Sequence, residues 1–165
     1  MEQDFAALTE PELTALGTAV GQQLASRPEG ILIALRGDLG AGKSVLARAI
    51  ARGAGVTSPM PSPTFNLVYR YRTRAGRTVA HLDLYRLTDP DDVWELGWEE
   101  LSGGDEITLI EWPERAESLL PADRWDVRLR QGALPELRAV VIETHAGAPE
   151  FPDGLIERLW APEQR

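Results

Sequence analysis

The fold of this chain is decided by the stretch ILIALRGDLGAGKS, residues 31–44. Its first part, Ile31 to Arg36, is short, apolar and partly β-branched, which is typical of a strand buried on both faces of a parallel sheet. Gly37 ends that strand, and apolar residues at helical spacing follow from Lys43 to about Arg52. The stretch therefore predicts a strand, a glycine-rich loop and a helix in direct succession.

The loop matches the pattern G-x-x-x-x-G-K-S/T between a strand and a helix, the context that makes this motif meaningful. Glycines let backbone amides converge on phosphate groups, and the helix N-terminus adds partial positive charge. The motif predicts that Lys43 meets the terminal phosphates and that Ser44 holds Mg²⁺. We expect a nucleoside triphosphate to bind at Gly37, Asp38, Leu39, Gly40, Ala41, Gly42, Lys43, Ser44 and Val45.

The base of the nucleotide is indicated by the basic residues. Lys43 is the only lysine among the 17 lysines and arginines. A compact ammonium fits inside a phosphate-binding loop, whereas an arginine fork is bulkier. A guanine-specific N-K-x-D motif would need a second lysine, and the chain has none. The sequence therefore favours ATP and ADP, bound with Mg²⁺.

Composition limits the class of protein. The 165 residues suit one domain, 1–165, and the lack of cysteine excludes disulfides and thiolate metal sites. A net charge of -9 argues against a direct electrostatic grip on DNA or RNA, which needs a clustered basic surface. The N-terminus has no signal-like pattern, and no apolar run approaches ~18 residues. We expect a cytoplasmic protein without membrane association.

Further elements surround the loop. A capping box at Thr9 predicts a helix over about Glu10 to Ser26, and the prolines of Ser58–Pro63 require an extended loop. The pattern predicts an α/β fold of the P-loop NTPase type, with a central mixed, mostly parallel sheet flanked by helices. The other expected elements are a β-hairpin of Phe65–Thr73 and Arg77–Leu84, a short acidic helix from Asp89, a strand at Ile107–Ile110, a helix from Pro113, a closing antiparallel pair of Trp125–Arg130 and Arg138–Thr144, and a final helix over Phe151–Trp160.

Two carboxylates are candidates for the metal and the attacking water. Asp83 and Glu111 each follow an apolar strand, and P-loop enzymes place a second carboxylate at such a strand end. We predict that both face the site, with Ser44 and one carboxylate near the metal and the other positioning water. Spacing alone does not rank Asp83 and Glu111, and each could instead cap the following turn.

Four other features are considered as site residues: three are interpreted as structural, and the role of one is left open. Residues 101–104, LSGG, resemble the start of an ABC-transporter signature, but Ile107 begins a strand where a long helix should follow. A turn is the better interpretation. His81 is expected to be a packed residue rather than a catalytic one, and Trp94 to lie in the core. Trp112 is left open because it follows Glu111 at a strand end.

Two segments outside the loop carry alternatives. The sequence Ser62-Pro63-Thr64 follows the second helix, where switch segments that sense the γ-phosphate are found, yet a plain connector is equally compatible. The one basic cluster is either a solvated surface or an acceptor-phosphate clamp, and it consists of Arg70, Arg72, Arg74 and Arg77.

Four strings in order, GDLGAGKS, SPTFNLVY, HLDLYRL and IEWPE, together resemble the TsaE (YjeE) family over roughly Thr14 to Arg138. The resemblance implies a P-loop ATPase that acts with the TsaD and TsaB proteins to install threonylcarbamoyl on the adenosine beside the anticodon of tRNA. Contact with tRNA is then indirect, through the partner proteins. ATP binding and hydrolysis would switch the contact with the TsaD and TsaB pair.

The family pattern implies roles for individual residues. Lys43 and Ser44 become the phosphate and Mg²⁺ contacts, and Asp83 and Glu111 the essential acidic pair. Lys43 is thus expected to be catalytic with both carboxylates, and Ser44 to share the metal with them. The family usually has threonine where Ser44 stands, which keeps the hydroxyl ligand.

Other family positions are matched outside this centre. Thr64 and Trp112 match family positions, and with Ser62 they form the expected switch or partner-facing set. Thr14 and Arg138 align with positions expected near the nucleotide.

Two other functions remain open at this point. A small-molecule or nucleoside kinase shares the fold and could use the arginine cluster on an acceptor phosphate. A nucleotide-dependent binding module with negligible turnover is the second alternative.

Overall fold

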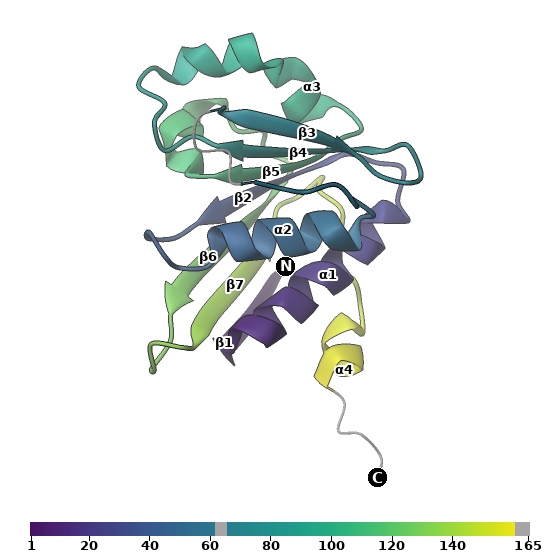
Figure 1. The fold of residues 1–165 in the computed structure, drawn as a ribbon, viewed down its shortest axis with the longest axis vertical. Helices are drawn as coiled ribbons and strands as arrows, with labels where there is room; N and C mark the ends of the chain where they lie inside the picture. The colour runs from purple at the N-terminus through teal and green to yellow at the C-terminus, as the bar shows by residue number, and fades with distance from the viewer. Residues whose placement is uncertain (62–65, 161–165) are drawn as a thin grey trace.

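The computed structural model describes residues 1–61 and 66–160, which form one seven-stranded sheet covered by helices (Figure 1). The strands are β1 (Glu2–Leu8), β2 (Ile31–Arg36), β3 (Val68–Arg72), β4 (Thr78–Asp83), β5 (Ile107–Glu111), β6 (Arg124–Gln131) and β7 (Arg138–Thr144). The helices are α1 (Glu10–Ala25), α2 (Lys43–Gly53), α3 (Trp98–Gly103) and α4 (Leu155–Trp160), with 3₁₀ helices η1 (Pro90–Leu96) and η2 (Pro113–Leu119). Within the described ranges, no helix is long and apolar enough to cross a membrane.

Strand β2 lies inside the sheet, parallel to β5 on one side and β6 on the other. Its residues alternate between two cores, which explains why the strand is apolar throughout. Ile31, Ile33 and Leu35 pack with α1 and α2, whereas Leu32 and Ala34 pack with residues of η1, α3 and η2. The prediction of a doubly buried parallel strand at these residues is confirmed.

The sheet is mixed, with strand order β1-β7-β6-β2-β5-β4-β3. Three neighbouring pairs are parallel and three are antiparallel, so the expectation of a mostly parallel sheet was wrong. The difference comes mainly from β1, a strand that the sequence analysis did not predict. Only Phe5 and Leu8 of this strand are buried, so its sequence lacks a clear alternation, and pairing with β7 holds it in the sheet.

Other predicted elements are found close to their expected bounds. Helix α1 begins at the capping box of Thr9. Strands β3 and β4 form the expected antiparallel hairpin, and strands β6 and β7 form the expected antiparallel pair. That pair does not close the sheet, since β1 adds beyond β7. The turn expected at residues 102–104 is instead the end of α3, and β5 begins at Ile107 as predicted.

The core assignment of Trp94 was wrong. Its side chain is 49% exposed, whereas Val93 of the same 3₁₀ helix and Trp98 of α3 are buried. A 3₁₀ helix repeats every three residues, so adjacent positions on it face in different directions. Val93 occupies the inward position and Trp94 the outward one.

Helices α1 and α2 lie side by side over one face of the sheet and approach closely through glycines (Figure 1). A Cβ atom at Gly21 would lie 2.0 Å from the carbonyl oxygen of Ile50, and one at Gly53 would lie 2.0 Å from that of Thr18. Backbone atoms cannot rotate away as side chains do. The spacing of the two helices depends on the absence of side chains at these glycines. It also sets the position of α2, which begins directly after the glycine-rich loop.

We predict that Gly21→Ala lowers the free energy of unfolding by about 2 kcal/mol, because overpacking outweighs the better helix propensity of alanine. Urea unfolding followed by circular dichroism measures the change. Gly103→Ala is the matched control, since a Cβ there meets nothing within 4 Å, and its stability should stay within about 1 kcal/mol of the wild type. Equal stability of the Gly21 variant and the control would contradict the close-packing account.

Candidate functional site

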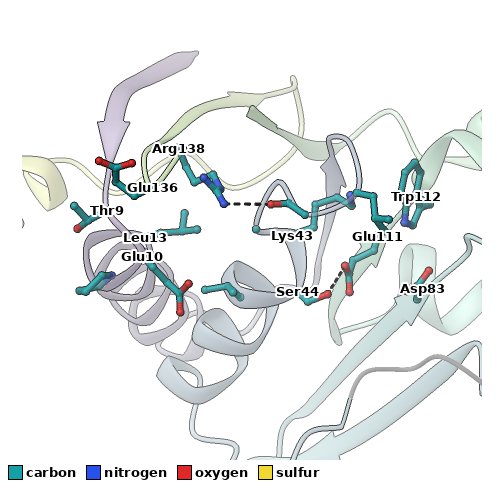
Figure 2. A pocket seen from close by; sticks show the side chains of 15 residues that line it. Thr9, Glu10, Leu13, Lys43, Ser44, Asp83, Glu111, Trp112, Glu136 and Arg138 are labelled. Carbon is teal, nitrogen blue, oxygen red and sulfur yellow. Dashed lines mark hydrogen bonds between the residues drawn. The ribbon is translucent and has the colours of Figure 1, made fainter. Parts of the chain in front are cut away.

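A pocket of about 540 Å³ opens where β2, β4 and β5 end (Figure 2). Its volume is in the range of nucleotide-sized ligand sites. On one side lie Lys43, Ser44, Asp83, Glu111 and Trp112; on the other lie Thr9, Glu10, Leu13, Glu136 and Arg138. The carboxyl edge of parallel strands is the place where α/β folds bind ligands.

The glycine-rich loop joins β2 to α2 with three positive φ angles: 150° at Gly37, 78° at Gly40 and 104° at Gly42. Gly42 is the N-cap of α2, and no side chain caps the helix there. The N–H groups of a helix's first turn have no intrahelical acceptor, so at α2 they are available to an anion in the pocket. A Cβ at Gly37 would lie 2.4 Å from the carbonyl oxygen of Leu129, so the loop rests directly on β6.

Lys43 is buried, with only 4% of its surface exposed. Its Nζ donates to the carbonyl oxygens of Gly37 at 2.5 Å and Asp38 at 2.9 Å. The same ammonium lies 4.1 Å from the centre of the Trp112 ring, within cation–π range. Burial lowers the pKa of Lys43, although nearby carboxylates, Glu111 foremost, act in the opposite direction. The lysine is thus held by its own loop and by Trp112, at the rim of the pocket.

Glu111 links the loop helix to the neighbouring strand. Its Oε1 accepts a hydrogen bond from Ser44 Oγ at 2.7 Å, drawn as a dashed line in Figure 2, and its Oε2 lies 2.7 Å from His81 Nε2. Burial acts to raise the pKa of Glu111, but the hydrogen bonds from His81 and Ser44 and the charge of Lys43 outweigh it, so the pKa is lowered. Glu111 is therefore a carboxylate at neutral pH.

Asp83 lies beside Glu111, because the two residues are register partners in the β4–β5 pair. Its Oδ1 accepts a hydrogen bond from the backbone N–H of Tyr85 at 2.9 Å. Burial and the negative charge of Glu111 raise the pKa of Asp83, against the effect of that hydrogen bond. A cation placed between two such carboxylates would relieve their repulsion.

The oxygen donors at this edge suit Mg²⁺. Among the residues that the structure describes, no cluster of three or more His, Asp or Glu side chains could hold a metal ion. Mg²⁺ at phosphate sites is usually held by one or two carboxylates together with phosphate oxygens and water. Asp83, Glu111 and the hydroxyl of Ser44 offer that kind of donor set beside the loop.

Trp112 has a strained backbone. With φ at 57° it is the only non-glycine residue of the described chain in the left-handed region. Such strain concentrates at ligand sites, and it is absent from any sequence pattern. The ring of Trp112 packs against Tyr85, with centroids 5.0 Å apart, and covers Lys43. The residue left open by the sequence therefore lines the pocket.

Arg138 and Thr14, both expected near a nucleotide, lie in different places. Arg138 lines the pocket and donates to the carbonyl oxygen of Gly40 at 3.3 Å (Figure 2). Thr14 lines a neighbouring depression between α1 and α2, and Leu13 faces the main pocket instead. The predictions for Ser62 and Thr64 lie outside the described residues.

Five residues that line the pocket, and one contact beneath it, were missed by sequence reasoning. His81 was interpreted as a packed residue, and it is buried, but it also contacts Glu111. The capping box located the start of α1 without showing that this end faces the loop. The missed lining residues are Thr9, Glu10, Pro11, Leu13 and Glu136.

An ion-pair network supports the strand that enters the loop. Arg36, the last residue of β2, donates to Asp126 Oδ1 at 2.6 Å and to both oxygens of Glu117 at 2.7 and 3.0 Å. Asp126 also accepts from Arg124 at 3.1 Å and lies 2.7 Å from a ring nitrogen of His145. Burial acts to raise the pKa of Asp126, but its bonds to Arg36 and the other cations lower it overall. The network joins β2, β6 and η2 next to Gly37.

We predict that Asp126→Asn lowers the free energy of unfolding by about 3 kcal/mol at pH 7, because it removes the buried negative charge that pairs with both Arg36 and Arg124. A lowered native pKa stabilises the fold above the ordinary carboxyl pKa of about 3.9, and this contribution is lost as pH falls through the lower native value. Urea unfolding at several pH values should therefore show the gap between variant and wild type shrinking below about pH 4. A gap that stays constant down to pH 3 would be evidence against the ionic account.

Comparisons with known proteins show which family the chain resembles. A family model described as "Threonylcarbamoyl adenosine biosynthesis protein TsaE" matches residues 8–139. Proteins named tRNA threonylcarbamoyladenosine biosynthesis protein TsaE are similar: the one from Haemophilus influenzae is 42% identical over 93 residues, covering 56% of this chain and 58% of that protein. Those from Rickettsia bellii and Rickettsia felis are 43% and 41% identical, covering 63% and 73% of this chain and 71% and 68% of theirs.

A solved structure agrees in fold. The crystal structure of YdiB from Bacillus subtilis superposes with a TM-score of 0.70 at 22% identity, covering 96% of this chain and 94% of that one. The family match over residues 8–139 runs from just before Thr9 to just after Arg138, and so contains every segment that lines the pocket.

Proposed function

This chain belongs to the TsaE family of threonylcarbamoyl adenosine biosynthesis proteins, and on that basis we propose that it binds ATP with Mg²⁺ and hydrolyses it during tRNA modification. The observation that carries the proposal is the meeting of two groups in one pocket. The glycine-rich loop brings Lys43 and Ser44, and the ends of β4 and β5 bring Asp83 and Glu111.

Each group has a separate task. The loop amides and Lys43 bind and orient the phosphates, and the ammonium exchanges the carbonyls of Gly37 and Asp38 for more strongly accepting phosphate oxygens. Mg²⁺, when bound, neutralises phosphate charge and orients the phosphates. Ser44, Asp83 and Glu111 would hold that ion, and one of the two carboxylates would orient the attacking water. The variants Glu111→Gln and Asp83→Asn, described below, test which carboxylate orients the water.

The charge of the chain and its family support a proposal for the wider role. A chain with a net charge of -9 is poorly suited to grip tRNA, so we propose that TsaD and TsaB carry the tRNA and that this chain acts on them in the cytoplasm. ATP binding and hydrolysis would switch its contact with the TsaD and TsaB pair between rounds of modification. The matches to the three relatives named above cover 58% to 71% of those proteins' lengths. The role of the whole relatives is therefore only proposed for this chain.

The kinase alternative is disfavoured by the placement of the basic cluster. The β3–β4 turn lies at the opposite end of β4 from Asp83, so its arginines lie away from the pocket. Arg77 donates to the carbonyl oxygens of Leu24, Arg27 and Glu29, and Arg70 to that of Leu96. These guanidinium groups tie the hairpin to neighbouring segments instead of forming an acceptor-phosphate clamp.

We predict that Glu111→Gln retains ATP binding but lowers the turnover number about 100-fold, because an amide supplies neither the charge nor the basicity of a carboxylate. Asp83→Asn tests the second acid in the same way. Phosphate release and isothermal titration with ATP measure the two quantities separately. Glu99→Gln, an exposed change of the same kind on α3, is the matched control and should behave as the wild type. An unchanged rate in either site variant removes that residue from the catalytic set.

We predict that Lys43→Ala weakens ATP binding at least about tenfold, since it removes a charge-assisted contact to phosphate. Titration with ATP in the presence of Mg²⁺ gives the affinity. If the variant binds ATP as tightly as the wild type, the loop is not the phosphate site.

We predict that purified TsaD and TsaB modify tRNA through repeated rounds only when this chain and ATP are both present. A time course of threonylcarbamoyladenosine formed per complex tests this, with the Glu111→Gln chain as the control. Repeated turnover without the chain would remove the proposed role. Basal and partner-stimulated ATPase rates distinguish it from a binding module that does not hydrolyse.

A further inference from the structure

His81 is a buried polar residue that the proposed mechanism does not use. It lies on β4, is 2% exposed, and shares a face of the strand with the fully buried Val79. A polar ring in such a place is costly unless it is hydrogen-bonded. Its hydrogen-bond partner is Glu111, whose Oε2 lies 2.7 Å from His81 Nε2.

The register of the sheet explains this contact. Asp83 pairs with Glu111 and His81 pairs with Leu109 in the parallel β4–β5 ladder. His81 and Asp83 are two residues apart, so both side chains project from the face on which Glu111 also lies. His81 thus lies one step deeper along the sheet than Asp83, beneath the carboxylate and not among the residues that line the pocket.

The hydrogen of this contact belongs to the histidine. Ser44 Oγ lies 2.7 Å from one oxygen of Glu111 and His81 Nε2 lies 2.7 Å from the other, which is the environment of a carboxylate, and a carboxylate only accepts hydrogen bonds. His81 Nε2 must therefore donate to Oε2. The other oxygen, Oε1, is then left to accept from Ser44 at 2.7 Å.

We propose that His81 is a positioning residue for Glu111: by holding Oε2 from below, it fixes the rotation of the carboxylate and presents Oε1 to Ser44 and to the pocket. His81, Glu111 and Ser44 form a continuous chain of hydrogen bonds from β4 through β5 to the start of α2. Without the histidine, a buried carboxylate oxygen would lose its donor and the group could turn away. The inference rests on the proposed ATPase function for its consequence, but its geometry concerns this chain alone.

The direct test does not depend on activity. The chain has two histidines, so a ¹⁵N-labelled sample gives a simple imidazole spectrum. We expect the ring whose chemical shift changes in Glu111→Gln to carry its hydrogen at Nε2, whereas the ring of His145, which contacts Asp126, does not respond to that change. A His81 ring with a bare Nε2, or one insensitive to the Glu111 change, overturns the proposal even if the chain hydrolyses ATP.

The kinetic test compares two replacements of His81. In His81→Gln the side-chain amide can still donate near the Nε2 position, whereas His81→Leu keeps the bulk and loses the donor. We expect the leucine variant to lose about 10- to 100-fold in turnover number with ATP affinity changed by less than about threefold, and the glutamine variant to recover most of the loss. Equal losses in both variants indicate packing alone and overturn the proposal.

A double variant shows whether His81 acts through Glu111. Adding His81→Leu to Glu111→Gln should reduce turnover little further, because the group that His81 positions is already altered. Fully additive losses overturn the proposal. If the leucine variant does not fold, His81→Asn replaces it, since its shorter amide withdraws the donor, and it should fail where glutamine succeeds. A wild-type chain without ATPase activity, alone or with TsaD and TsaB, contradicts the proposed function and leaves the spectroscopic test of His81 in force.

Discussion

The parallel pairing of β2, β4 and β5 is the constraint on which the site depends. In this ladder Leu35, Asp83 and Glu111 lie at one level, since Glu111 is the register partner of both other residues. The chain must leave β2 immediately beyond that level, and the loop from Gly37 returns it into α2. Ser44 then reaches Glu111 at 2.7 Å. Without the aligned strand ends, the hydroxyl and the two carboxylates would have no common edge.

The pocket brings one buried ammonium and two carboxylates close together. Lys43 is buried among carboxylates, yet its ammonium donates to two backbone carbonyls of its own loop. Asp83 and Glu111 lie together but differ, because the pKa of Asp83 is raised and that of Glu111 is lowered by its hydrogen bonds. A phosphate group is a stronger acceptor for Lys43 than a carbonyl, and a divalent cation relieves the acidic pair. These are the groups that the proposed metal-bound triphosphate would engage.

The sequence was informative where a local pattern has a local cause. The buried strand from Ile31, the loop to Ser44 and the capping box at Thr9 follow from hydrophobicity, glycine geometry and backbone hydrogen bonding within a few residues. It was uninformative where the cause lies elsewhere in the chain. The strand β1 exists because β7 offers it an edge, and Trp94 faces outward because η1 turns Val93 toward the core.

The amino-acid order alone located the glycine-rich loop between its strand and helix, the carboxylates Asp83 and Glu111 at two strand ends, and the family resemblance, because each lies in a short contiguous motif. The folded chain alone showed which residues meet: that His81 contacts Glu111, that Trp112 covers Lys43 with a left-handed backbone, and that Leu13 rather than Thr14 faces the pocket. These contacts depend on register, helix rotation and strand order. Such quantities are set by packing between segments far apart in the chain, so no local motif contains them.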